Sequence, residues 1–67
     1  MEQETSQIID NIRKIRLNQK VSVLNLANEV GISHSHLFYI ESKRVVPSID
    51  VVVKIAKALN VRLIELL

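Results

Sequence analysis

The sequence predicts a compact all-α domain of five short helices, and three observations lead to this prediction. Apolar residues recur at spacings of three and four along most of the chain, which is the period of an amphipathic helix. The chain has one glycine and one proline, whereas folds built from strands need more turn residues. The apolar fraction of 48% exceeds that of disordered chains, so we expect residues 1–67 to form one ordered domain.

The composition also limits the class of protein. No cysteine is present, which excludes disulfides and thiolate metal sites and fits a reducing, cytoplasmic setting. The N-terminal residues lack the features of a signal peptide, and no apolar stretch approaches the roughly 18 residues that cross a bilayer. We therefore expect a cytoplasmic protein without a membrane partner. Residues 11–44 carry six basic and two acidic residues, and this basic excess favours an anionic partner.

The first two helices are separated by a break at residues 20–22. Before the break, isoleucines with basic residues between them recur at helical spacing: Ile8, Ile9, Ile12 and Ile15. Ser22 is the expected N-cap of the second helix, because its hydroxyl can accept a hydrogen bond from a first-turn amide. Gly31, which can adopt the left-handed conformation, is expected to end this helix after about two and a half turns.

The third and fourth helices are predicted in the same way. Ser33 is the expected N-cap of the third helix, whose inward side is formed by Leu37, Ile40 and Glu41. The fourth helix is expected to begin after Pro47 and Ser48 and to end at Asn60, which tolerates the left-handed conformation. Its inward face is predicted to contain Ile49, Val52, Val53, Ala56 and Leu59. Residues 61–67 then supply a short fifth helix.

Two short helices joined by a three-residue turn make up the helix-turn-helix unit, here about residues 22–42. The second helix of such a unit can lie in the major groove of DNA. The stretch "SVLNLANEVGISHSHLFYIESKRVVPSIDVVVKIAKALNV" also resembles the DNA-binding domain of phage repressor and Cro-like regulators, the XRE-type family. The residues that carry the resemblance are Leu26, Ala27, Gly31, Ile32, Ser33, Ile40, Glu41, Pro47 and the final "KIAKALNV". It covers about residues 8–67 and implies a lambda-repressor-like fold.

The resemblance also implies roles for individual residues. The positions that match readers of base edges are His34, Ser35 and Tyr39, with His36 and Phe38 beside them. The positions that match phosphate contacts are Ser22, Val23, Lys43 and Arg44. A structural ion pair is implied between Arg16 and Glu41. Serine and neutral histidine can donate to and accept from base edges, and a tyrosine can offer a hydroxyl or pack on a thymine methyl.

This chain departs from the family pattern at three positions. Val23 replaces a glutamine that binds phosphate in relatives, so only its backbone amide remains for this contact. Lys43 replaces a glycine, so either Lys43 adopts a strained left-handed conformation or the loop takes another route. Phe38 replaces a polar residue and is expected to touch either thymine methyl groups or another protein.

Apolar residues near the C-terminus exceed what so small a core can hold. One interpretation is a frayed tail that packs on the first helix, and the other, which we favour, is a homodimer. The expected dimer contacts are Val51, Leu63, Ile64, Leu66 and Leu67, mainly within residues 61–67. A two-fold dimer would place two recognition helices about 34 Å apart in successive major grooves.

No catalytic residue, metal site, cofactor site or small-molecule site is predicted. His34 and His36 would point about 200° apart on a helix, and no carboxylate is placed to orient a serine–histidine pair. The sequence therefore predicts a sequence-specific DNA-binding transcriptional regulator, more specifically a repressor that binds a palindromic operator. The alternative is a protein-interaction module that kept the fold and lost specific DNA binding, an interpretation motivated by Val23, Phe38 and the apolar C-terminus.

Overall fold

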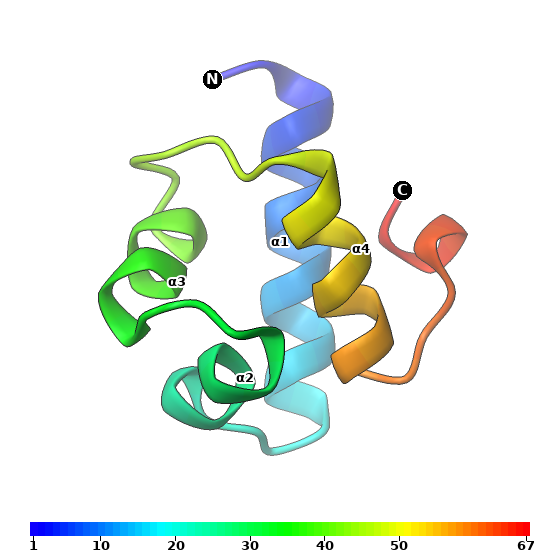
Figure 1. Ribbon diagram of the computed structural model, residues 1–67. Helices are drawn as coiled ribbons and strands as arrows, with labels where there is room; N and C mark the ends of the chain where they lie inside the picture. Colours follow the sequence, from blue (N-terminus) through cyan, green and yellow to red (C-terminus); the bar gives the residue numbers. More distant parts are fainter.

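The computed structural model describes residues 1–67 and contains four α-helices followed by a 3-10 turn (Figure 1). The elements are α1 (Gln3–Asn18), α2 (Val23–Val30), α3 (His34–Glu41), α4 (Ile49–Ala58) and the 3-10 turn η1 (Leu63–Leu66). Helix α2 packs against α3 and α4, α3 also contacts α1, and η1 contacts α1 and α4. The all-α prediction is confirmed. No helix has both the length and the apolar character needed to cross a membrane.

The predicted fifth helix is wrong, because residues 61–67 form only the four-residue turn η1. The backbone N–H of Arg62 donates to Glu65 Oε2 at 2.7 Å, which closes the turn at its start. The side-chain amide of Asn11 in α1 donates to the carbonyl of Leu66 at 2.8 Å and fixes its end. A turn this short completes 3-10 bonds but no continuous series of α-helical bonds.

Serine side chains start three of the helices, as the sequence predicts. The hydroxyl oxygens of Ser22, Ser33 and Ser48 accept hydrogen bonds from backbone N–H groups three residues later, at 3.0, 3.0 and 3.1 Å. Each bond satisfies a first-turn donor that has no acceptor within its helix. These local bonds set where α2, α3 and α4 begin.

All four α-helices end in the same way. One or two positions after each helix end, a residue has a left-handed backbone, with φ values of 59°, 86°, 64° and 59° at Lys20, Gly31, Lys43 and Asn60. In each case the next backbone N–H donates to a carbonyl five residues earlier, which is the Schellman motif. The predicted ends at Gly31 and Asn60 are confirmed. Lys43 adopts the left-handed conformation despite its side chain, so the loop after α3 does not take another route.

Twelve buried apolar residues form the core, and every helix contributes to it. These residues are Ile9, Ile12, Leu26, Ala27, Val30, Leu37, Ile40, Val52, Ile55, Ala56, Leu59 and Leu66. The prediction for α4 was partly wrong: Ile49 is 71% exposed, Val53 is half-buried and outside the core, and Ile55 is fully buried instead. Ile49 lies on the same stripe of the helix as Val52, but at its first turn, where the stripe extends beyond the core.

Candidate nucleic-acid interface

Helix α3 is held to the core by one side and leaves its other side open. Leu37 and Ile40 are fully buried, and they fix the rotation of the helix about its axis. The five side chains predicted to contact bases all reach solvent: His34, Ser35, His36, Phe38 and Tyr39. The structure brings His34, Ser35, Phe38 and Tyr39 together on one exposed surface, which we call the α3 outer face. His36 is exposed on the same helix but does not line this surface.

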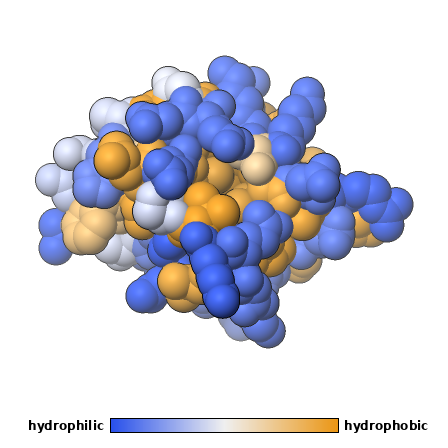
Figure 2. Space-filling model, turned by 90° about the horizontal axis from the view of Figure 1, so that it is seen from below, coloured by the Kyte–Doolittle hydropathy of each residue, from blue (hydrophilic) through white to orange (hydrophobic).

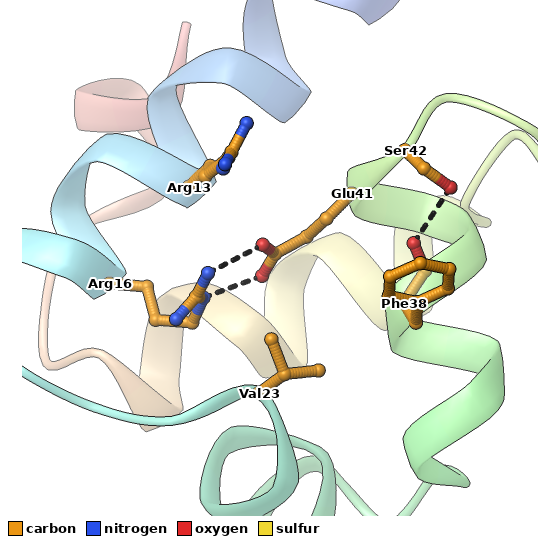
Figure 3. Close-up of a pocket in the computed structure, with 6 residues that line it drawn as sticks. All are labelled: Arg13, Arg16, Val23, Phe38, Glu41 and Ser42. Atoms are coloured by element: carbon orange, nitrogen blue, oxygen red, sulfur yellow. Dashed lines mark hydrogen bonds and ion pairs between the residues drawn. The ribbon is translucent and has the colours of Figure 1, made fainter.

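A buried ion pair fixes the C-terminal end of α3 to α1 (Figure 3). Arg16 Nε and Nη2 donate to the two carboxylate oxygens of Glu41 at 2.7 and 2.8 Å. The third donor, Nη1, reaches the carbonyl oxygen of Val21 at 2.8 Å, in the turn before α2. Only 9% and 7% of the Arg16 and Glu41 side chains are exposed. This arrangement sets the position of α3 relative to α1 and to the start of α2, which is a structural role.

Two exposed aromatic rings stand side by side on the α3 outer face. The centroids of Phe38 and Tyr39 are 5.9 Å apart and their planes meet at 63°, an edge-to-face arrangement that is favourable for aromatic rings. The guanidinium carbon of Arg44 lies 5.8 Å from the Tyr39 centroid, within the range of a cation–π contact. The backbone N–H of Arg44 also donates to the Tyr39 carbonyl at 2.9 Å. The Tyr39 ring therefore contacts both Phe38 and Arg44.

The starts of α2 and α3 can both bind anions through their backbones. Amides of the first turn lack acceptors within the helix and carry partial positive charge, so they are good ligands for phosphate oxygens. The half-buried Val23 side chain packs against the core, which leaves only its amide for such a contact. Ser22 lies beside it and its oxygen already caps the helix, but its hydroxyl can still donate. The surface seen from the α2 end has hydrophilic side chains projecting around apolar patches (Figure 2).

Lys43 and Arg44 differ in their surroundings. Lys43 Nζ lies 2.8 Å from Asp10 Oδ1 of α1, and the two side chains are 35% and 56% exposed. A pair this exposed is weak, so a phosphate could compete with Asp10 for the ammonium group. Arg44 is exposed and has no carboxylate partner. Sequence reasoning did not identify Asp10, because the partners are far apart in the chain and their approach depends on how α1 packs.

A small cavity lies beside the buried ion pair and brings Arg13 next to α3 (Figure 3). Its lining consists of Arg13, Arg16, Val23, Phe38, Glu41 and Ser42. Arg13 is exposed and makes no ion pair, so its charge is free for an anion at this edge of the interface. Sequence reasoning missed this residue. The signal was its spacing of three residues from Arg16, which places both on one side of α1.

The predicted dimer contacts do not all lie on the surface. Leu66 is fully buried in the core of its own chain, so its assignment to a partner surface was wrong. Ile64 and Leu67 are 66% and 69% exposed, whereas Val51 and Leu63 are half-buried. Leu63 and Leu67 line a shallow apolar groove together with Thr5, Ile8, Val46, Pro47, Ile49 and Val52. We call this surface the α4 groove.

No group of three or more histidine, cysteine, aspartate or glutamate residues in the structure could hold a metal ion. His34 and His36, the only histidines, are exposed on α3 and make no side-chain hydrogen bond. The arrangement of the α3 outer face is suited to hydrogen bonding and packing, and it contains no group of residues arranged for proton transfer or nucleophilic attack.

Comparison with known proteins identifies this arrangement. The model of a family described as Helix-turn-helix matches residues 12–66, a range that includes α2, α3 and α4. The chain is also similar to the crystal structure of a protein described as hypothetical transcription factor NHTF from Neisseria. That similarity has a TM-score of 0.85 and 28% sequence identity, and it covers 98% of this chain and 75% of that chain. No curated protein matches the chain.

Proposed function

The chain belongs to the XRE-type helix-turn-helix family, and we propose that it is a sequence-specific regulator of transcription that acts in the cytoplasm. The family consists of DNA-binding domains with a lambda-repressor-like fold and is not a family of enzymes. The observation that carries the proposal is the α3 outer face, where exposed polar and aromatic side chains stand on a helix held rigidly by buried contacts. The similar protein from Neisseria is described as a transcription factor, which supports the same role here.

In the proposed complex α3 lies in the major groove, with its N-terminal residues toward the base edges. His34 and Ser35 in the first turn can each donate a hydrogen bond to a base edge or accept one from it. Tyr39, one turn later, can offer its hydroxyl while Arg44 and Phe38 limit the movement of its ring. His36 and Phe38 lie on the two sides of this group and contact adjacent base pairs.

Phosphates on both sides of the groove are proposed to bind the starts of α2 and α3 and the residues after α3. The Ser22 hydroxyl and the Val23 amide donate to one phosphate, and Arg44 contacts another. Lys43 exchanges Asp10 for a phosphate when DNA binds. Neutralisation of phosphates by cationic side chains releases counterions, so the affinity should fall as the salt concentration rises.

A homodimer through the α4 groove would place two α3 helices on a palindromic operator, about 34 Å apart. Ile49, Leu63 and Leu67, which line the groove, would contact the second copy. Val51 and Ile64, the other predicted contacts, lie outside the lining of the groove. A two-fold dimer doubles the contacts of a domain that would otherwise bind only one half-site. Occupation of an operator excludes polymerase from the same DNA, so repression needs no surface other than those described.

The competing function is a protein-interaction module with the same fold. It is favoured by the Val23 side chain, the exposed Phe38 and the α4 groove. Fluorescence anisotropy with mixed-sequence duplex DNA at low and raised salt separates the two functions. A regulator binds at low salt and loses affinity steeply as the salt concentration rises. Absent or salt-independent binding by a folded sample would contradict the proposal.

Variants of Tyr39 and Arg44 test the assigned roles. Tyr39→Ala should relax the preference between sequences, whereas Arg44→Ala should weaken binding to all sequences and flatten the salt slope by about one unit. Arg44→Lys is the matched control, because it keeps the charge and loses the planar group that stacks on Tyr39. It should keep the salt slope and relax the preference between sequences. Equal effects of Tyr39→Ala and Arg44→Ala on both readouts would refute the assignment.

A further inference from the structure

The cavity beside the buried ion pair is lined by one cation without a partner, Arg13, and we propose that this residue binds a phosphate of the DNA backbone. The inference rests on the proposed function. The phosphate contacts proposed above come from the starts of α2 and α3 and from the residues after α3. Arg13 would add α1 to the surface that contacts DNA.

The charges that line the cavity leave Arg13 free to bind an anion. Arg16, the other arginine of the lining, already uses all three of its nitrogens, with hydrogen bonds of 2.7 to 2.8 Å to Glu41 and to the Val21 carbonyl. The charges of Arg16 and Glu41 compensate each other. Arg13 is exposed and makes no ion pair, so the lining keeps one uncompensated positive charge.

The other polar groups of the lining cannot take the same role. Val23 has no side-chain donor, and the Ser42 hydroxyl already donates to the Phe38 carbonyl at 2.9 Å. The guanidinium of Arg13 is planar, and its N–H groups can bond two oxygens of one phosphate. Hydrogen bonds between charged partners of this kind are stronger than bonds between neutral groups. Arg13 is therefore the side chain of this cavity that is suited to a phosphate.

The position of the cavity indicates that the phosphate comes from the DNA backbone. The lining connects Arg13 of α1 with Val23 at the start of α2 and with Phe38 on the α3 outer face (Figure 3). The proposed complex has base edges against α3 and a phosphate at the Val23 amide. The phosphates of that DNA strand are then the anions nearest to Arg13.

The salt dependence of binding measures the contact, with the full chain and the duplex that it selects from random DNA. Arg13→Ala should flatten the slope of log affinity against log salt by about 0.9 for each bound copy. Over a rise from roughly 50 to 200 mM salt, the fall in affinity should then be about 3.5-fold smaller per copy. Lys14→Ala is the matched control, because Lys14 is an exposed cation of α1 that does not line the cavity. It should keep the wild-type slope.

Single methylphosphonate linkages, each of which removes the charge of one phosphate, locate the contact on the DNA. We expect one phosphate for each bound copy at which this replacement weakens binding by the wild type and by Lys14→Ala but not by Arg13→Ala. Arg13→Lys keeps the charge but loses the planar group, so it should keep the salt slope and bind less tightly. Since Arg13 is exposed, its variants are expected to fold, which circular dichroism verifies.

An unchanged salt slope in Arg13→Ala, or the same slope in Arg13→Ala and Lys14→Ala, would overturn the inference. A flatter slope in Arg13→Ala without any phosphate whose neutralisation this variant tolerates would also overturn it, because Arg13 would then act on DNA only at long range. Both results leave the proposed function in place, since the wild type still binds DNA. Absence of salt-dependent DNA binding by the wild type would instead contradict the proposed function.

Discussion

Removal of the Arg16 side chain should destabilise the domain more than removal of any exposed charge. Arg16 makes three hydrogen bonds of 2.7 to 2.8 Å, two to Glu41 and one to the Val21 carbonyl. In Arg16→Ala the Glu41 carboxylate, whose side chain is only 7% exposed, would keep its charge without a partner. An uncompensated buried charge is costly because it has lost most of its hydration.

The magnitude follows from these contacts. Breaking a buried pair by removing one partner costs about 3–5 kcal/mol. A domain of 67 residues has a total free energy of unfolding of about 3–10 kcal/mol, at roughly 0.05–0.15 kcal/mol per residue. We therefore expect Arg16→Ala to lose a large part of its stability and to melt at least about 12 °C lower than the wild type.

Urea unfolding followed by circular dichroism measures the effect, with a double-mutant cycle as the control. The double variant Arg16→Met with Glu41→Met removes both charges and fills the space with apolar atoms. Such replacements are often neutral or stabilising, so the double variant should be more stable than Arg16→Ala by about 2 kcal/mol or more. A loss below about 1 kcal/mol in Arg16→Ala, or strictly additive effects of the two single methionine variants, would refute this reasoning.

Three further predictions test other contacts. Ser33→Ala should lower the free energy of unfolding by about 1 kcal/mol, because the α3 cap is lost. Ser33→Asp can still cap the helix and should keep the free energy of unfolding of the wild type. Equal losses for the two variants in urea unfolding would contradict this prediction. Asp10→Asn should release Lys43 and steepen the salt dependence of DNA binding, whereas Asp50→Asn makes the same charge change on α4 and should leave it unaltered. Leu66→Ala should cost about 2–5 kcal/mol in thermal or urea unfolding, because the side chain is fully buried; a loss typical of surface residues would contradict its place in the core.

The helix boundaries could be predicted because they depend on local chemistry. A serine hydroxyl caps a helix through an amide three residues away, and Gly31 or Asn60 ends a helix through its own backbone. For Lys43 the sequence predicts only two alternatives, a left-handed backbone at this residue or another route of the loop. The choice is settled by the bond from the Arg44 amide to the Tyr39 carbonyl, which the left-handed residue makes possible.

Features that depend on tertiary contacts were harder to predict. Periodicity defines an apolar stripe on α4 but not where the core ends, so Ile49 was placed inside although it is exposed. The sequence pattern places Leu66 in a dimer contact because it does not show that η1 packs back onto α1 and α4, where Asn11 donates to the Leu66 carbonyl from 55 residues away. The contact of Arg44 with Tyr39 likewise depends on the path of the loop after α3. The sequence pattern does not show which of these residues come into contact in the folded chain.

The central claim is that the α3 outer face reads DNA sequence, and selection of bound duplexes from a random pool tests it most directly. The wild-type protein should enrich a short motif present twice in inverted orientation, with centres about 34 Å apart, one helical turn of DNA. Tyr39→Ala should lose the preference at some positions of that motif and keep it at others. A bound pool that remains random, or a motif that is identical for the wild type and Tyr39→Ala, would contradict the claim.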